Sequence, residues 1–141
     1  MAAEPSAYAL DSFALLAYLE GEAGRPRVEE VLRGAQSGKH CLYLSLVNLG
    51  EVMDIIEREN NLIQAQRALA AVDQLPVKIV PVSRATVLAA AHIKALYPIS
   101  YADAFAVVTA QDRQCILLTG DPEFRSVAAD ALISVEWLPR R

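Results

Sequence analysis

"CILLTGDPEF", residues 115–124, passes directly from a continuous apolar run to an aspartate, a proline and a glutamate. The run at its start has no polar face, which is typical of a strand buried on both sides of a sheet. Asp121 followed by Pro122 is a common beginning of a helix, because proline fits the first helical position. The stretch therefore predicts a buried strand that leads at once into a helix.

The same succession of apolar strand and helix recurs along the chain. Strands are expected at residues 7–10, 41–45, 77–83, 115–120 and 133–138. Helices are expected at residues 11–22, 27–35, 46–59, 62–75, 84–97, 100–113 and 121–129. Apolar strands that alternate with helices indicate a parallel sheet covered on both faces. The predicted fold class is α/β, a three-layer α/β/α domain with a central, mainly parallel sheet of about five strands.

Length and composition are those of one globular domain, expected to span residues 1–141. A chain of this size buries roughly 68–70% of its unfolded surface, which is enough for an ordinary core. No signal-like segment and no run of about 18 apolar residues occurs, so we expect a cytoplasmic protein without a membrane segment. Cys41 and Cys115 form no CxxC pair, which argues against a zinc site. The net charge of −4 disfavours nonspecific binding of nucleic acid over the whole surface, but it does not exclude a local acidic site or a local basic rim.

Four acidic residues are expected at one edge of the sheet. Asp11 comes directly after the first strand, and Asp121 comes directly after the fourth. Asp103 lies in the first turn of helix 100–113, and Glu51 lies in the second turn of helix 46–59. In a parallel sheet the loops at the carboxyl ends of the strands gather at one edge, where open α/β folds bind ligands. We therefore expect these four carboxylates to lie near one another.

Each aspartate also has a purely structural interpretation. Asp11 and Asp121 suit helix N-caps, and Asp103 has the spacing of a capping box with the serine three residues before it. Glu51 is harder to explain in this way, because its neighbours one turn away on either side are apolar and should face the core. No Lys or Arg stands three or four residues from it. A buried carboxylate of this kind is costly unless it is paired or metal-bound.

A cluster of such carboxylates requires protons or a cation. Two like charges about 4 Å apart repel by roughly 4 kcal/mol at an effective dielectric of about 20. Oxygen ligands without His or Cys suit Mg²⁺ or Mn²⁺. Divalent ions held by carboxylates activate water and stabilise the charge on a phosphate. The four acids therefore favour phosphodiester hydrolysis.

The segments LDSFALLAYL, NLGEV, SYADAFAVVTA and TGDPEF, taken in this order, resemble PIN-domain nucleases, and above all VapC-type toxins of toxin–antitoxin pairs. The resemblance extends over residues 7–138. It implies a Mg²⁺- or Mn²⁺-dependent endoribonuclease that acts on RNA, the toxin of a type II pair, with a VapB-like antitoxin partner and a homodimer. The catalytic residues and metal ligands that it implies are Asp11, Glu51, Asp103 and Asp121.

The resemblance also implies supporting residues. Ser12, Asn48 and Thr119 match polar positions that orient metal-bound water or substrate in the family. The family's usual DTS or DSS opening is DSF here, so Phe13 stands in place of a hydroxyl residue. Glu123 has two interpretations, a ligand of a second metal or a solvated side chain, and we expect the solvated one.

The sequence defines the substrate contacts less clearly than the acidic site, and it leaves one alternative function open. Scattered basic side chains could contact phosphate, although such residues more often only face solvent; they are Arg25, Arg27, Arg33, Lys39, Arg84, Arg113 and Arg125. A phosphoaspartyl phosphatase would need a second aspartate where Phe13 stands, and no GxGxxG, P-loop or GxSxG motif occurs. The alternative from another class is a noncatalytic PIN-fold module that acts through RNA or protein partners.

Overall fold

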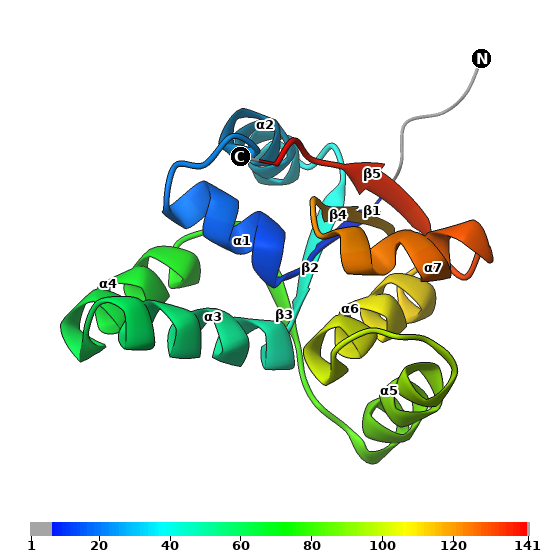
Figure 1. Ribbon diagram of the computed structural model, residues 1–141. Helices are drawn as coiled ribbons and strands as arrows, with labels where there is room; N and C mark the ends of the chain where they lie inside the picture. The colour runs from blue at the N-terminus through cyan, green and yellow to red at the C-terminus, as the bar shows by residue number, and fades with distance from the viewer. Residues whose placement is uncertain (1–6, 141) are drawn as a thin grey trace.

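The computed structural model describes residues 7–140 (Figure 1). The strands are β1 (Ala7–Leu10), β2 (Cys41–Ser45), β3 (Lys78–Val80), β4 (Ile116–Thr119) and β5 (Ser134–Trp137). The helices are α1 (Ser12–Leu19), α2 (Arg25–Gln36), α3 (Leu46–Glu59), α4 (Leu62–Asp73), α5 (Arg84–Leu96), α6 (Tyr101–Asp112) and α7 (Arg125–Ala129). A 3₁₀ turn, η1 (Pro122–Phe124), precedes α7.

The five strands form one sheet in the order β3-β2-β1-β4-β5, and every pair of neighbours is parallel. The predicted α/β class is therefore confirmed, and the sheet is parallel throughout. From the central β1, the chain adds strands first on one side and then, from β4 onward, on the other. The strand order reverses between β1 and β4, and open α/β sheets bind their ligands at such a point.

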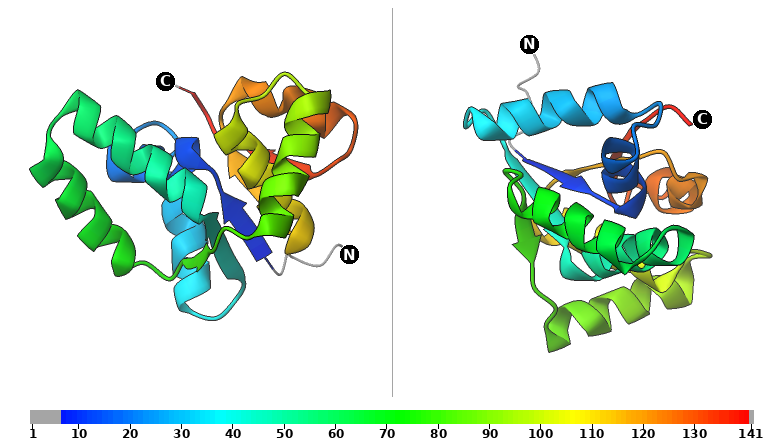
Figure 2. Two further views of the ribbon diagram at one scale, coloured as in Figure 1. Left: turned by 90° about the horizontal axis from the view of Figure 1, so that it is seen from below. Right: turned by 90° about the vertical axis from the view of Figure 1, so that its left-hand side faces the viewer.

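Helices cover both faces of the sheet (Figure 2). Ala7 and Ala9 of β1 belong to the core formed with α5, α6 and α7. Tyr8 and Leu10 point to the opposite face and join the core formed with α1, α2, α3 and α4. Successive strand residues face opposite sides, so a strand buried on both faces needs apolar residues at every position. This requirement explains the continuous apolar runs in the sequence.

Helix α6 is buried from Asp103 to Ala110, since the sheet lies on one side of it and α5 packs on the other. A short connection containing Gln114, with φ of 53°, joins α6 to β4. The helix therefore runs antiparallel to β4, and its first turn returns to the edge at which β1 and β4 end. This topology carries Asp103 toward the residues that follow those two strands.

Two elements differ from their expected extents. The strand expected at 77–83 is limited to β3, because Pro81 has no N–H to donate to a sheet ladder. The helix expected at 121–129 is divided into η1 and α7. This division matters for the site, because the 3₁₀ turn determines the direction of the acidic side chains that follow β4.

The remaining general predictions concern the cysteines and the membrane. Both cysteines are free thiols; Cys115 is buried and Cys41 is half-buried. Within residues 7–140, every helix is too short or too polar to cross a lipid bilayer.

Candidate metal centre

Asp11 lies at the junction of β1 and α1 and is almost completely buried, with 1% of its surface exposed. Its Oδ1 accepts a hydrogen bond from the backbone N–H of Ala14 at 2.9 Å, so it caps α1. Its Oδ2 accepts a hydrogen bond from Thr119 Oγ1 at 2.5 Å. The structural interpretation of Asp11 as an N-cap is thus correct, but the cap also holds a buried carboxyl group at the switch point of the sheet.

Thr119 connects two of the predicted acids. It is fully buried at the end of β4, where it donates to Asp11 and accepts a hydrogen bond from the backbone N–H of Asp121 at 3.0 Å. Because β1 and β4 are adjacent, one hydroxyl group can bond to the residues that follow both strands. Thr119 therefore sets the relative positions of Asp11 and Asp121.

Replacing Thr119 by Val is expected to lower the free energy of unfolding by about 1–3 kcal/mol, because two buried polar groups lose a partner. The matched control is Thr109→Val. Thr109 is also buried, but its hydroxyl only donates to the Phe105 carbonyl one turn earlier in α6. Urea unfolding at neutral pH measures both losses, and equal losses for the two variants would contradict the bridging role of Thr119.

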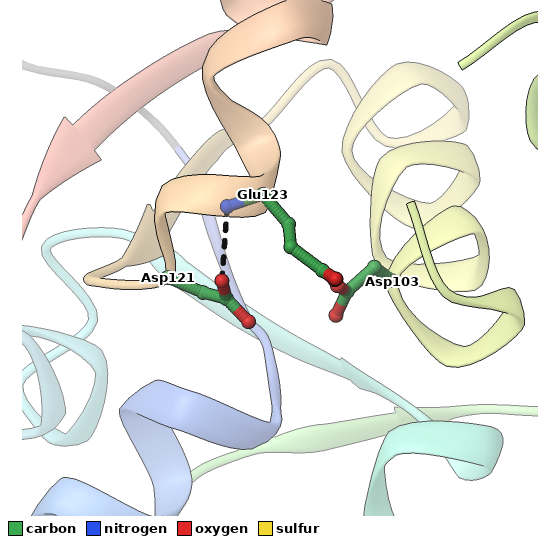
Figure 3. A group of neighbouring side chains, drawn as sticks. All are labelled: Asp103, Asp121 and Glu123. Atoms are coloured by element: carbon green, nitrogen blue, oxygen red, sulfur yellow. Dashed lines mark hydrogen bonds between the residues drawn. The ribbon is translucent and has the colours of Figure 1, made fainter. Parts of the chain in front are cut away.

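Asp103 lies in the first turn of α6, with 5% of its surface exposed. Its backbone N–H donates to the hydroxyl of the cap residue Ser100 at 3.1 Å. Its own carboxyl group does not complete a capping box but points toward Asp121 and Glu123 (Figure 3). The helix start is therefore capped by Ser100, and the Asp103 carboxyl group is available for another role.

Three carboxyl groups meet beside the end of β4 (Figure 3). Asp103, Asp121 and Glu123 each offer an oxygen, and these oxygens all lie within 4.8 Å of one another. Asp121 also caps η1, since its Oδ1 accepts from the backbone N–H of Glu123 at 2.9 Å. Glu123 is exposed, in line with the solvated side chain that we expected, yet its carboxyl group also belongs to this acidic group.

Burial and neighbouring charge make the carboxyl groups of Asp103 and Asp11 hard to ionise. Burial raises the pKa of Asp103 to about 9, with further increases from a hydrogen bond with Glu123 and from the charges of Asp121, Asp11 and Glu123. Burial also raises the pKa of Asp11 to about 7, although hydrogen bonds from Thr119 and from the α1 backbone oppose the increase. At neutral pH and without a cation, Asp103 is therefore expected to retain its proton.

These properties fit a divalent cation. The group contains only carboxylate oxygens, which are the ligands that Mg²⁺ and Mn²⁺ prefer over zinc-type nitrogen and sulfur sites. A positive charge among the carboxyls would replace the proton of Asp103 and remove the repulsion that opposes ionisation. Asp11 lies close enough to Asp103 and Asp121 for their charges to act on one another, although it is outside the group of three.

Glu51 is placed differently from the three aspartates. It lies in the second turn of α3 and is half-buried, so the expected core-facing position is reached only in part. Its carboxyl group lies outside the group of three, and it forms no hydrogen bond or ion pair with residues 7–140. The structure therefore brings together Asp11, Asp103 and Asp121 with Glu123, and the role of Glu51 stays a prediction.

Asn48 links the helices that carry two of the aspartates. It is fully buried in α3, where its Nδ2 donates to Ser12 Oγ at 3.3 Å and to the Ala102 carbonyl at 3.1 Å. Ser12 Oγ in turn donates to the Asn48 carbonyl at 3.4 Å. Ser12 follows Asp11, and Ala102 precedes Asp103. Asn48 thus ties the start of α1 to the start of α6, while its buried Oδ1 has no protein partner among the described residues.

Phe13 has a packing function that the sequence did not reveal. A Cβ added to Gly120 would lie only 2.4 Å from the Phe13 ring and 3.1 Å from the Leu138 carbonyl. The backbone just before Asp121 can therefore rest on this ring only if residue 120 is glycine. The aromatic side chain that replaces the family's usual hydroxyl at position 13 supports the loop that carries Asp121.

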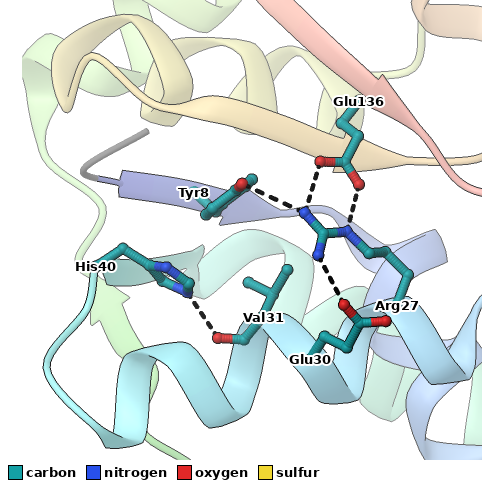
Figure 4. Close-up of polar contacts among 6 residues, drawn as sticks. All are labelled: Tyr8, Arg27, Glu30, Val31, His40 and Glu136. Carbon is teal, nitrogen blue, oxygen red and sulfur yellow. Dashed lines mark hydrogen bonds and ion pairs between the residues drawn. The ribbon is translucent and has the colours of Figure 1, made fainter. Parts of the chain in front are cut away.

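Three of the candidate phosphate contacts, all in α2, form ion pairs with glutamates. Arg27 binds Glu136 through Nε at 2.7 Å and Nη2 at 3.0 Å, and it also pairs with Glu30 (Figure 4). Arg25 and Arg33 both pair with a glutamate of their own helix. The arginines of α2 are therefore occupied, and the interpretation of these three side chains as structural surface residues is the better one.

Solved structures of similar fold include several VapBC toxin–antitoxin proteins. A chain of VapBC2 from Rickettsia felis, bound to a promoter DNA fragment, has 15% identity and a TM-score of 0.72, covering 94% of this chain and 99% of that chain. VapC20 from Mycobacterium tuberculosis, a toxin that cleaves the sarcin–ricin loop, has 20% identity and a TM-score of 0.69, covering 94% and 99%. VapBC-5 from Mycobacterium tuberculosis has 20% identity and a TM-score of 0.59, covering 97% and 100%. At these identities the likeness concerns the fold.

The sequence itself carries the family relationship. No curated protein matches it. The family model of the PIN domain matches residues 8–130, which include Asp11, Glu51, Asp103, Asp121 and Glu123. The match spans most of the chain and agrees with the parallel sheet, the strand order and the fold of the similar structures. The chain therefore belongs to the PIN domain family.

Proposed function

We propose that this protein is a Mg²⁺- or Mn²⁺-dependent endoribonuclease that hydrolyses RNA phosphodiester bonds. The observation that supports this function is the group of carboxyls at the switch point of the sheet, where Asp103, Asp121 and Glu123 offer oxygens within 4.8 Å of one another and Asp11 is buried nearby. Buried like charges at this density are costly unless a cation binds among them. Their position at the carboxyl edge of a parallel sheet is also where an α/β fold receives a substrate.

Each acidic residue has a defined part in this proposal. Asp103, Asp121 and Glu123 would hold the cation, and Asp103 would be ionised when it does so. Asp11 adds negative charge on the opposite side and is kept in place by Thr119. A bound Mg²⁺ or Mn²⁺ lowers the pKa of water and stabilises the charge that develops on a phosphate. Glu51 extends the site from α3, and Asn48 holds the helix starts that carry Asp11 and Asp103.

The biological setting that we propose is a type II toxin–antitoxin pair. The similar structures include a toxin–antitoxin complex from Klebsiella pneumoniae with 18% identity and a TM-score of 0.63 over 95% of this chain and 99% of that chain. By this likeness, the protein is the toxin, forms a homodimer in the cytoplasm, and is inhibited by a VapB-like antitoxin. The support for this setting is the shared fold together with the family relationship.

The direct test is cleavage of structured RNA by protein that has been purified away from any antitoxin. Cleavage is expected with Mg²⁺ or Mn²⁺ and is expected to stop on addition of EDTA. Asp11→Asn should abolish it, because the amide removes a charge from the site while it can still cap α1. Asp73→Asn is the matched control, since Asp73 is the exposed last residue of α4, and this helix lies apart from α6 and α7 (Figure 1).

The same experiment separates the nuclease from the noncatalytic alternative. A binding module would retain RNA or a protein partner but would leave RNA intact with every divalent ion. Cleavage that is unchanged in Asp11→Asn would also defeat the proposal, because a contaminating nuclease would then account for it. The fold of each variant is checked by circular dichroism before activity is compared.

A further inference from the structure

A pocket adjoins the acidic group on the side of β5. It is lined by Gly120, Pro122, Arg125, Trp137, Leu138 and Arg140. Gly120 and Pro122 stand on either side of Asp121, so one loop forms both the wall of the pocket and part of the acidic group. The pocket volume is about 440 Å³, and pockets that hold small ligands range over about 300–1,000 Å³. A group bound in this pocket would lie beside the loop that carries Asp121.

The register of the sheet brings Trp137 to the pocket. Trp137 is paired with Thr119, the residue that contacts both Asp11 and Asp121. On the preceding residue, the carboxylate of Glu136 is held by Arg27 of α2 (Figure 4). Successive side chains of a strand point to opposite faces, so Trp137 lies on the face away from α2, beside α7.

Trp137 is unusually open to solvent for its type. It is 45% exposed, whereas tryptophan is highly buried on average. Leu138, the next residue, is buried and its N–H donates to the Thr119 carbonyl at 2.8 Å. The indole ring is therefore carried on a backbone that is anchored on both sides, by the ion pair of Glu136 and by the bond of Leu138. A ring held in this way forms a platform on which a flat group can stack.

Two arginines of the pocket lack the carboxylate partners that occupy the arginines of α2. Arg125 opens α7, and Arg140 lies beyond β5; both are exposed. Neither forms an ion pair with any residue in the range 7–140. A guanidinium group binds a phosphate through two parallel hydrogen bonds, so the two side chains suit the backbone of a nucleic acid.

We propose that this pocket binds one nucleotide of single-stranded RNA beside the scissile phosphate, with its base stacked on Trp137 and its phosphate bound by Arg125 and Arg140. The choice of RNA as the ligand rests on the proposed function. A stacking ring next to a pair of cations is the arrangement by which proteins bind single-stranded nucleic acid without reading its sequence. The pocket therefore strengthens RNA binding and positions the strand for cleavage, but it does not select a particular base.

The chain permits a direct measurement, because Trp137 is its only tryptophan. Intrinsic fluorescence is followed while a short single-stranded oligoribonucleotide is added in Ca²⁺, and a gel verifies that the RNA stays intact. Saturable quenching is expected. Parallel titrations with a labelled oligonucleotide give Kd for the variants. Trp137→Ala should weaken binding by about tenfold, and Trp137→Phe should recover most of the loss, because phenylalanine can also stack.

The arginines are tested by the double variant Arg125→Ala Arg140→Ala. Its Kd is expected to rise by about tenfold or more, and the slope of log Kd against log salt should fall by about 0.7, since the two arginines bind one phosphate and each neutralised phosphate of a single strand contributes about 0.7. Arg67→Ala is the matched control, because Arg67 is exposed on α4, away from β5 and α7 (Figure 1). It should alter neither Kd nor the salt slope.

The outcomes distinguish this inference from the proposed function. Unchanged Kd and salt slope in the double arginine variant, or RNA binding without quenching of Trp137, would overturn the proposal that this pocket binds RNA, even if the protein cleaves RNA. Quenching and arginine-dependent binding without cleavage in Mg²⁺ or Mn²⁺ would support RNA binding in the pocket and contradict the proposed nuclease activity.

Discussion

Asp103→Asn is expected to reduce RNA cleavage by on the order of a thousandfold and, at the same time, to raise the melting temperature of the metal-free protein. The loss of cleavage follows because the neutral amide is a poor ligand for a divalent cation. The gain in stability follows because the folded protein must keep Asp103 protonated, with a pKa of about 9, whereas the unfolded chain ionises it at about 3.8. Asparagine has the same shape and no such requirement.

The gain in stability should depend on pH. At pH 8 the cost of protonating Asp103 on folding is large, and we expect a rise in Tm of about 5 °C or more in EDTA. At pH 5 the same cost is much smaller, since this pH is close to the unfolded pKa of the carboxyl group. Thermal unfolding in EDTA measures the difference, and initial cleavage rates in Mn²⁺ measure the loss of activity.

Asp73→Asn is the control for both measurements, because Asp73 is exposed and its removal should change neither. A variant at position 103 that cleaves RNA at a rate near that of the unmodified protein would contradict the role of Asp103 as a cation ligand. An Asp103→Asn variant that melts at a lower temperature than the unmodified protein in EDTA at pH 8 would contradict the raised pKa of Asp103.

Without divalent cations, the protein is expected to become less stable as pH rises from 5 to 9. The folded-state pKa values of Asp11, about 7, and Asp103, about 9, both exceed the unfolded value of 3.8. The folded protein therefore binds more protons than the unfolded chain over this range, and raising the pH favours unfolding. The stability that protonation provides is complete below about pH 4 and is lost as pH rises through the two folded-state values.

Mg²⁺ or Mn²⁺ should reverse this loss. A cation that binds only to the ionised carboxyls of the folded state stabilises that state, and protons compete with it at low pH. We therefore expect a larger rise in Tm with Mg²⁺ at pH 8 than at pH 5. NaCl at matched ionic strength controls for screening. The double variant Asp11→Asn Asp103→Asn should lose both the pH dependence and the metal effect, and equal metal effects at the two pH values would show that the cation binds elsewhere.

Much of the fold and part of the site could be predicted from the residues. Continuous apolar runs predicted the strands because a sheet covered on both faces requires them. The positions of Asp11, Asp103 and Asp121 at the starts of helices followed from local capping patterns, and the strand order then brought these three residues to one edge. Asp11 and Asp121 kept their capping roles, which use one carboxyl oxygen each, whereas the carboxyl group of Asp103 takes no part in the cap that Ser100 provides.

The glutamates were less predictable than the aspartates. Glu51 was expected within the acidic group and Glu123 in solvent, whereas the structure brings Glu123 beside Asp103 and leaves Glu51 outside the group of three. A glutamate has a longer and more flexible side chain, so the direction of its carboxyl group depends on the surroundings. In this protein the 3₁₀ turn after Asp121 decides that direction for Glu123, and the sequence predicted an ordinary helix there.

The sequence by itself determined the order of strands and helices, the caps that begin the helices and the acids that follow the strands, because hydrophobic periodicity and capping depend on neighbours along the chain. Only the tertiary structure decided that Thr119 bridges Asp11 and Asp121, and that the carboxyl group of Asp103 lies beside those of Asp121 and Glu123. These contacts join residues that are far apart in the chain. Their distances depend on how β1, β4 and α6 pack, and a change of a few ångströms alters both the hydrogen bonds and the pKa values.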